Sequence, residues 1–382
     1  MIQMELISGF SETDFFWIIN SVAVFLVCVF CAGLLIPQIL LISYRKQLFD
    51  QPDERKTHKG IVPRLGGIAF KPVIFFAIAL MFGLSRLCGY SHMLEGIASE
   101  SRSIAFGFCC IMLLYLVGIA DDLIGIHYRV KFVIQIMCGV MIIAGGMWID
   151  NLYGLFGIHE LPVWAGYPLT VLVVVFIINA INLIDGIDGL ASGLSGVATL
   201  FYGVVFFQLG EYIYAVFSFA TLGVLVPFFY YNVFGDAEKQ KKIFMGDTGS
   251  LTIGMMLCIL SLKLLQCQVE GGNPDSLTNL LVFAYSPLLI PSLDVVRVYL
   301  HRMRNGKNPF LPDKNHIHHK LLALGMHQRA AMVTIITASV LFSLCNILLS
   351  RYIDVTILLL ADLLAWTLLN MRLTNRANKI KK

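Results

Sequence analysis

The sequence has little charge and contains long stretches with none. Only 14% of its 382 residues are Asp, Glu, Lys or Arg, whereas 58% are hydrophobic. Soluble domains are usually about 45–50% apolar. Apolar runs of about 20 residues recur along the chain, and each is long enough to cross the ~30 Å hydrocarbon core of a bilayer. This composition excludes an ordinary soluble enzyme and predicts an all-α, polytopic integral membrane protein.

Three other absences narrow the classes of protein. The first fourteen residues contain no Lys or Arg, so the first apolar run lacks the basic region of a signal peptide and is predicted to be a retained span. Most of the nine cysteines lie within apolar segments, and even Cys28-x-x-Cys31 is expected to pack inertly on a membrane helix. No GxxxxGK[ST] motif occurs, which leaves an ATP-driven pump unsupported.

Hydropathy predicts eleven membrane-spanning helices. They cover residues 15–42, 67–87, 104–120, 130–148, 169–184, 190–208, 212–234, 249–266, 279–300, 331–350 and 354–370. Residues 1–370 are therefore interpreted as one transmembrane domain, and residues 371–382 as a basic cytoplasmic tail.

Basic residues are divided unequally between the two sides of these spans. Alternate connections, together with the tail, carry 22 of the 28 Lys and Arg residues. These connections are 43–66, 121–131, 184–189, 235–248 and 301–329. The positive-inside rule predicts that they lie in the cytoplasm. With an odd number of spans, the N-terminus is then outside and the C-terminus is cytoplasmic.

Unusual polar residues gather in the same connections. In "INLIDGIDGLA", residues 181–191, Asp185 and Asp188 are each followed by glycine and come directly after an apolar run. A carboxylate within hydrocarbon costs a few kcal/mol, so a short polar turn at the membrane boundary is the better interpretation. The other clusters are "DERKTHKGIVPRLGG" with Lys59 and Arg64, "GIADDLIGIHYRVK" with Asp121, Asp122 and Lys131, Asn179 and Asn182 before Asp185, "FMGDTGS" with Phe244 and Asp247, and "NPFLPDKNHIHHKL" with His316, His318 and His319.

Together these residue types indicate phosphate chemistry at a membrane surface. Carboxylates favour a hard divalent cation such as Mg²⁺ or Mn²⁺, and lysine and arginine beside them favour phosphate. A glycine-flanked helix start suits an anion. Each motif alone has a plainer interpretation: a polar helix end, a helix cap, solvated loop histidines, or charges that only set topology. "HIHH" without companion cysteines is a weak zinc site. Their gathering on one predicted face favours phosphoryl transfer onto or from a lipid.

Four of these motifs, "ADDLIGI", "NAINLIDGIDGLA", "FMGDTGSL" and "HIHHKL", occur in an order that resembles the polyprenyl-phosphate N-acetylhexosamine-1-phosphate transferases. The resemblance spans about residues 40–325. It implies ten or eleven helices around a cytoplasm-facing cleft in the bacterial inner membrane. It also implies Mg²⁺-dependent transfer of a sugar-1-phosphate from a UDP-sugar to polyprenyl phosphate, with release of UMP. A homodimer is the assembly the resemblance suggests, and no nucleic acid is involved.

The histidine loop is most similar to that of the branch that uses UDP-N-acetylglucosamine and starts O-antigen, common-antigen or teichoic-acid linkage units. The branch that uses UDP-N-acetylmuramoyl-pentapeptide tends to have a Thr-Pro-Thr-Met-Gly-Gly loop, where this chain has "IVPRLGG". That second branch remains the alternative donor class.

The resemblance also implies roles for individual residues. Asn182 and Asp247 would be metal ligands, Asp121 and Asp122 would serve the lipid phosphate and the chemistry, and Asp185 would line the same cleft. Substrate contacts would come from Lys59, Arg64, Lys131, Asn179, Asp188, Phe244, His316, His318 and His319. Among these, Phe244 would stack on uracil, Asp188 would help to recognise it, and Lys131 would contact the phosphates. Direct in-line attack by the lipid phosphate is favoured over a two-step route through an aspartyl-phosphate.

Two other classes of function fit the sequence less well. An ion-coupled transporter would place polar residues near the bilayer midplane in two related halves, but here they cluster at one face and no internal repeat is visible. A lipid-binding scaffold without catalysis would not need so many carboxylates around one cleft.

Overall fold

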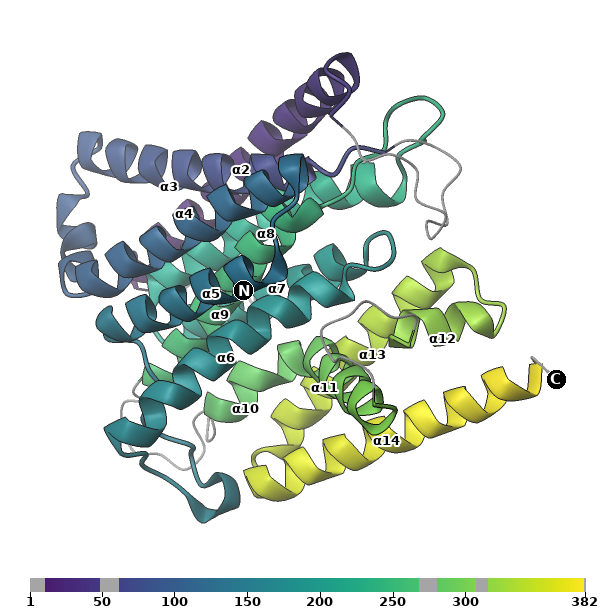
Figure 1. The fold of residues 1–382 in the computed structure, drawn as a ribbon. Helices are drawn as coiled ribbons and strands as arrows, with labels where there is room; N and C mark the ends of the chain where they lie inside the picture. Colours follow the sequence, from purple (N-terminus) through teal and green to yellow (C-terminus); the bar gives the residue numbers. More distant parts are fainter. Residues whose placement is uncertain (1–10, 49–61, 268–279, 307–314, 381–382) are drawn as a thin grey trace, which may run out of the picture.

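The computed structural model describes residues 11–48, 62–267, 280–306 and 315–380, and within them the chain is a bundle of helices (Figure 1). The all-α, polytopic fold is confirmed: ten helices in the described part are long and apolar enough to cross a membrane. The helices are α2 (Glu12–Arg45), η1 (Gly66–Ala69), α3 (Phe70–Leu87), η2 (Ser91–Ala98), α4 (Ser101–Ile124), α5 (Tyr128–Ala144), η3 (Leu155–Gly157), α6 (Val163–Ile184), α7 (Leu190–Gln208), α8 (Tyr212–Val233), α9 (Gly246–Gln266), α10 (Leu280–Tyr285), η4 (Ser286–Leu288), α11 (Leu289–Arg304), α12 (Ile317–Ala323), α13 (Gln328–Leu349) and α14 (Val355–Ile380).

The fourth predicted span, 130–148, is the shorter helix α5, which is not among those ten. It has 17 residues, which corresponds to about 26 Å along the helix axis. It packs against α4 on one side and α6 on the other. The helix therefore lies within the bundle at the lower limit of spanning length.

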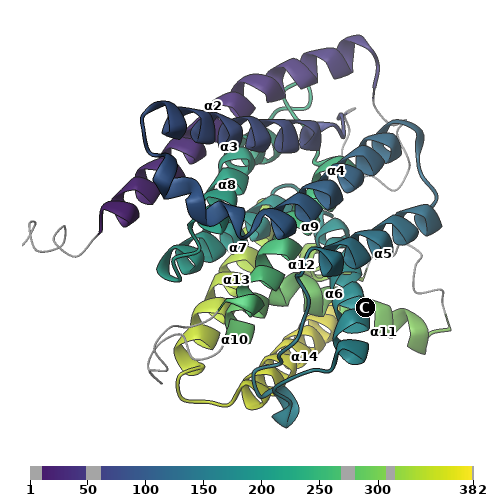
Figure 2. The same ribbon diagram turned by 90° about the vertical axis from the view of Figure 1, so that its left-hand side faces the viewer.

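The ninth predicted span, 279–300, is broken into α10, η4 and α11. Pro287 within η4 has no N–H to donate and disrupts the regular helix. The carbonyl of Ala284 instead accepts hydrogen bonds from the hydroxyls of Tyr202, at 2.6 Å, and Ser261, at 3.2 Å. Figure 2 shows that α11 leaves the bundle in a direction different from that of α10. The break was not predicted.

The C-terminal tail also differs from the prediction. A span was expected to end at residue 370, but α14 continues as a helix to Ile380. Most of the basic segment 371–382 thus extends α14 by almost three turns.

Helix α9 is the centre of the bundle, and every residue from Thr248 to Leu265 is buried. It contacts α3, α4, α6, α7, α8 and α10. Two glycines permit the closest of these approaches: Gly118 of α4 lies against the backbone of Thr248, and Gly254 of α9 lies against Ile178 of α6. The first turn of α9 is thereby surrounded by the ends of its neighbours, and this turn carries Asp247.

Candidate active site

The sharp turn at Gly246 joins two of the predicted motifs. Its φ of 71° lies in the left-handed region that favours glycine. The amide of Phe244 donates to the carbonyl of Pro63 at 2.8 Å, and the amide of Gly66 donates to the carbonyl of Phe244 at 3.0 Å. The end of the "IVPRLGG" loop, which contains Arg64, therefore runs beside "FMGDTGS". A side chain at position 246 would collide with the Arg64 carbonyl and the Asp122 carboxylate.

Asp122 caps the N-terminus of α9. Its two carboxylate oxygens accept hydrogen bonds from the amides of Asp247, at 2.8 Å, and Thr248, at 2.9 Å, and from the Thr248 hydroxyl, at 2.6 Å. The first amides of a helix have no partner within it, so this carboxylate satisfies them from a neighbouring helix. Asp122 fixes the first turn of α9 against the last turn of α4.

Lys131 joins the carboxylates of Asp121 and Asp247. Its ammonium group lies 2.9 Å from Asp121 Oδ2 and 2.6 Å from Asp247 Oδ2, and all three side chains are half-buried. Asp121 also accepts the amide of Ile126 at 2.7 Å. The Asn182 amide donates to Asp247 Oδ1 at 3.2 Å. Helices α4, α5, α6 and α9 thus contribute one functional side chain each to one charged cluster.

Asn179 and Asp185, which flank Asn182 in the sequence, make other contacts than Asn182 does. Asn179, one turn earlier on α6, donates to Gln135 of α5 at 2.6 Å and so joins α6 to α5. Asp185 follows the last residue of α6. Burial, reinforced by the nearby Asp247 and Asp188 carboxylates, raises the pKa of Asp185 to about 7.

Asp188 forms a buried ion pair with Lys242, at 2.6 Å. The turn around it is anchored by Asn232, whose side chain accepts the Gly189 amide at 2.6 Å and donates to the Ile243 carbonyl at 2.8 Å. Sequence reasoning counted Lys242 only among the basic residues and missed Asn232. No pattern in the sequence predicts that these two residues contact "DGIDG", because Asn232 lies on α8 and Lys242 on the loop that follows it.

The histidine motif is organised by Asp294 of α11, a fully buried carboxylate. One oxygen lies 2.8 Å from His316 Nδ1, and the other accepts the Ile317 amide at 3.0 Å. Arg297 donates to the same carboxylate at 2.9 Å and to the carbonyl of Asn315. Sequence reasoning missed Asp294 and gave Arg297 no role in the site. The signal available was an acidic residue in an apolar span, three positions before an arginine.

His318 brings the histidine motif to the aspartate motif. Its imidazole is buried, and both ring nitrogens lack a hydrogen-bond partner among the described residues. It packs so closely on Gly186 that a methyl group there would overlap the ring. Burial, with the neighbouring His319 and His316, lowers the pKa of His318 to about 3, so the ring is neutral at pH 7. The His319 ring lies 4.2 Å from it, centre to centre.

Three further residues were predicted to contact the substrates: Phe244, Arg64 and Lys59. Phe244 is half-buried and Arg64 is exposed beside the turn at Gly246. Lys59 lies outside the described residues. Across the described ranges, no group of three His, Cys, Asp or Glu side chains lies close enough together to hold a zinc ion.

Comparison with known proteins agrees with this geometry. A model of glycosyl transferase family 4 matches residues 104–265. The chain is 31% identical to an undecaprenyl-phosphate alpha-N-acetylglucosaminyl 1-phosphate transferase of Yersinia pestis, over 84% of this chain and 82% of that protein. The chain belongs to glycosyl transferase family 4. The transferase of the same name from Escherichia coli K12 is 32% identical, over 84% of this chain and 82% of its own length. A probable undecaprenyl-phosphate N-acetylglucosaminyl 1-phosphate transferase of Bacillus subtilis is 32% identical, over 87% and 85%.

The family assignment confirms the resemblance drawn from the motifs. It also confirms the prediction that the protein is an enzyme that transfers a sugar phosphate. The family match runs from α4 to α9 and so includes Asp121, Lys131, Asn182 and Asp247. It ends before Asp294 and His316. The histidine motif nevertheless contacts the matched region, because His318 packs on Gly186.

Proposed function

We propose that the enzyme transfers N-acetylglucosamine-1-phosphate from UDP-N-acetylglucosamine to undecaprenyl phosphate. The products are undecaprenyl-diphospho-N-acetylglucosamine and UMP, in the first membrane step of a cell-surface polysaccharide. The observation that carries the proposal is the Asp121–Lys131–Asp247 cluster at the start of α9, in a chain related over most of its length to transferases of that name. UDP-N-acetylmuramoyl-pentapeptide is the alternative donor.

The cluster fits a magnesium ion, with Mn²⁺ as a substitute. Asp247 and Asn182 offer hard oxygen ligands, and no larger set of ligating side chains converges within the described ranges. Mg²⁺ usually takes one or two carboxylates and completes its shell with water and substrate phosphates. Asp247 and Asn182 would hold the ion, with Asp121 beside them. When bound, it would neutralise charge on the diphosphate of the donor.

The chain's own residues prepare the reaction by position and charge. Lys131 would neutralise the diphosphate as an oxygen of the acceptor phosphate attacks the sugar-side phosphorus and UMP leaves. Electrostatic stabilisation of this kind is usually the largest contribution to phosphoryl transfer. The sugar C1–O bond stays intact, so the anomeric configuration is retained.

Hydrogen bonding assigns different tasks to the two adjacent aspartates. Both oxygens of Asp122 are engaged by the first turn of α9, which makes it a positioning residue. Asp121 already accepts from Ile126 and Lys131. A strong base is unnecessary, because a phosphate monoester has its second pKa near ~6 and is mostly a dianion at pH 7. This supports direct attack over a route through an aspartyl-phosphate.

The proposal includes an orientation in the membrane. The site would face the cytoplasm of a bacterium across its inner membrane, with the N-terminus outside and the C-terminus inside. Support comes from the excess of Lys and Arg in the connections that carry the site residues. A homodimer stays a prediction from the family.

The deciding experiment is turnover of purified protein with undecaprenyl phosphate, Mg²⁺ and either UDP-sugar, following UMP and the lipid product. UMP and lipid-linked N-acetylglucosamine diphosphate, lost on addition of EDTA and in Asp247→Ala, would support reaction and donor together. Turnover only with the pentapeptide donor would overturn the donor. No turnover with any UDP-sugar by folded protein would overturn the reaction.

A further inference from the structure

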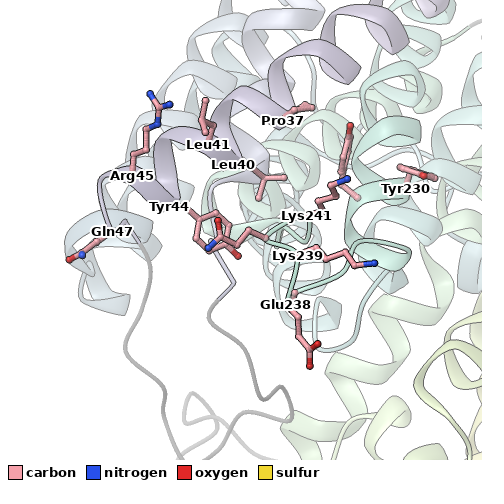
Figure 3. Close-up of a pocket in the computed structure, with 13 residues that line it drawn as sticks. Pro37, Leu40, Leu41, Tyr44, Arg45, Gln47, Tyr230, Glu238, Lys239 and Lys241 are labelled. Atoms are coloured by element: carbon pink, nitrogen blue, oxygen red, sulfur yellow. The ribbon is translucent and has the colours of Figure 1, made fainter.

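A hollow away from the active site opens between the ends of α2 and α8. It has a volume of about 980 Å³ and is shown in Figure 3. Its lining residues are Pro37, Leu40, Leu41, Tyr44, Arg45, Gln47, Tyr230, Tyr231, Ala237, Glu238, Lys239, Gln240 and Lys241. None of these side chains belongs to the charged cluster around Asp247 or to the histidine motif.

The lining is apolar along α2 and becomes basic toward the C-terminal end of that helix. Pro37 and Leu41 of α2 form one wall, and Leu41 is 46% exposed at the perimeter of the bundle. Tyr230 of α8 is 61% exposed on the other side of the opening. Tyrosine side chains of this kind favour the boundary between hydrocarbon and headgroups. Exposed tyrosine beside exposed apolar residues is the pattern expected at the headgroup level of a lipid-facing surface.

Beyond the tyrosines, the hollow is bordered by cations. Arg45 ends α2, and Lys239 and Lys241 lie on the loop after α8, all three exposed. Among the described residues of the lining, Glu238 is the only acidic side chain and three are basic, so their net charge is positive. Lys239 Nζ lies 3.7 Å from Asp236 Oδ2, and both side chains are exposed. Such a contact contributes little and does not prevent Lys239 from meeting another anion.

We propose that this hollow binds the phosphate headgroup of an anionic bilayer phospholipid. The headgroup phosphate would contact Lys239 and Lys241, and one acyl chain would lie along Pro37 and Leu41. A basic residue near a membrane surface increases the affinity for anionic lipid about five-fold. This site differs from the acceptor site of the reaction, because the hollow and the Asp247 cluster share no side chain. It depends on the active-site end of the bundle being at the cytoplasmic leaflet, which is part of the proposed function.

Lipid retention tests the site directly and does not depend on turnover. Full-length protein is equilibrated with equal amounts of phosphatidylglycerol and phosphatidylcholine, and retained lipid is counted by native mass spectrometry. We expect the wild type to retain one phosphatidylglycerol with about a twenty-fold preference over phosphatidylcholine. The double variant Lys239→Ala/Lys241→Ala should lose nearly all of that preference. Ala237→Trp, which places a bulky side chain in the hollow beside Lys239 and Lys241 without changing charge, should lose it as well.

The matched control removes the same charge elsewhere on the same end of the bundle. Arg372→Ala/Arg376→Ala changes two exposed cations of α14 and should retain the lipid like the wild type. An equal loss in this control, or retention by Ala237→Trp, would overturn the site in favour of general surface attraction. Displacement of phosphatidylglycerol by equimolar undecaprenyl phosphate would overturn the assignment and make the hollow a site for the acceptor. UMP release by each variant confirms folding and tests the proposed reaction separately.

Discussion

Asp294 Oδ2 lies 2.8 Å from His316 Nδ1, although the two residues are 22 positions apart, one within α11 and the other directly before α12. The carboxylate is fully buried and also holds the first amide of α12. This contact determines which nitrogen of His316 faces away from Asp294, and it places α12 so that His318 packs on Gly186.

Replacing this carboxylate should impair catalysis more than substrate binding. Asp294→Asn keeps the size of the side chain but presents an amide to His316, so the imidazole loses its fixed orientation. We expect kcat for UMP release to fall about 10–100-fold, as is typical when the partner of a functional histidine is lost. The KM for the UDP-sugar should change less. Asp150→Asn, at an exposed position, is the control, and an unchanged kcat in Asp294→Asn would contradict the assignment.

Lys131 should be needed for turnover and not only for folding. Lys131→Met removes the cation between Asp121 and Asp247 and leaves the two carboxylates facing each other. Loss of one preorganised electrostatic contact to the transition state typically lowers kcat about 10²–10³-fold. Arg129→Met, on the same helix and fully exposed, should retain activity. Equal activity of the two variants would exclude Lys131 from the reaction.

The Asp188–Lys242 pair permits a test that separates structure from binding. Asp188→Asn or Lys242→Met alone removes one charge of a buried ion pair and should lower the free energy of unfolding by about 3 kcal/mol. The double variant should recover most of that loss, measured by thermal unfolding in detergent. If Asp188 also contacts the nucleotide, the stable double variant will still show a KM for the UDP-sugar raised at least about ten-fold. A normal KM would restrict Asp188 to a structural role.

The contact between Gly186 and His318 predicts a loss of activity without a large loss of stability. Gly186 is exposed and has no positive φ, so alanine is tolerated by the backbone. Its methyl group would displace the His318 ring, and we expect turnover to fall about ten-fold with a change in Tm of about 2 °C or less. Gly83→Ala, where no atom lies within 4 Å of the added methyl, is the matched control. Full activity of Gly186→Ala would show that His318 does not need this position.

The raised pKa of Asp185 predicts how cation affinity changes with pH. Burial raises that pKa to about 7, so the carboxyl is mostly protonated at pH 6 and mostly ionised at pH 8. Ionisation adds a negative charge near Asp247, and the apparent affinity for Mg²⁺ should rise up to about ten-fold over this range, in step with the ionised fraction. Asp185→Asn should remove that part of the rise.

Two readouts measure this pH dependence: the Mg²⁺ concentration for half-maximal UMP release, and Mn²⁺ binding followed by electron paramagnetic resonance without substrate. The same pH dependence in Asp185→Asn and wild type would contradict the role of Asp185.

Spans and motif locations could be predicted from sequence because each depends on local composition. Hydropathy predicted a span over residues 190–208, and α7 covers the same residues. The excess of Lys and Arg in alternate connections alone predicted that Asp121, Asp122 and Asp247 lie on the same face of the membrane. Proximity of Asp121 to Asp247, by contrast, depends on how α4 packs on α9, which requires a close backbone approach at Gly118.

Partners from distant helices could not be predicted. Asp294 looks like an isolated charge in an apolar span until α12 folds back onto it, and Lys242 looks like one basic loop residue among several. The break at Pro287 depends on Tyr202 and Ser261, on two other helices, to satisfy the Ala284 carbonyl. In each case the decisive contact joins residues whose separation in sequence carries no periodic signal.

The complete enclosure of α9 has a consequence for biosynthesis. Five of the helices that contact it, α3, α4, α6, α7 and α8, precede it in the chain, and α10 follows. A chain that ends before α9 therefore lacks the helix against which five of the earlier helices pack. Such a chain contains Asp121 and Lys131 but not Asp247, so the charged cluster can form only once the chain extends through the start of α9.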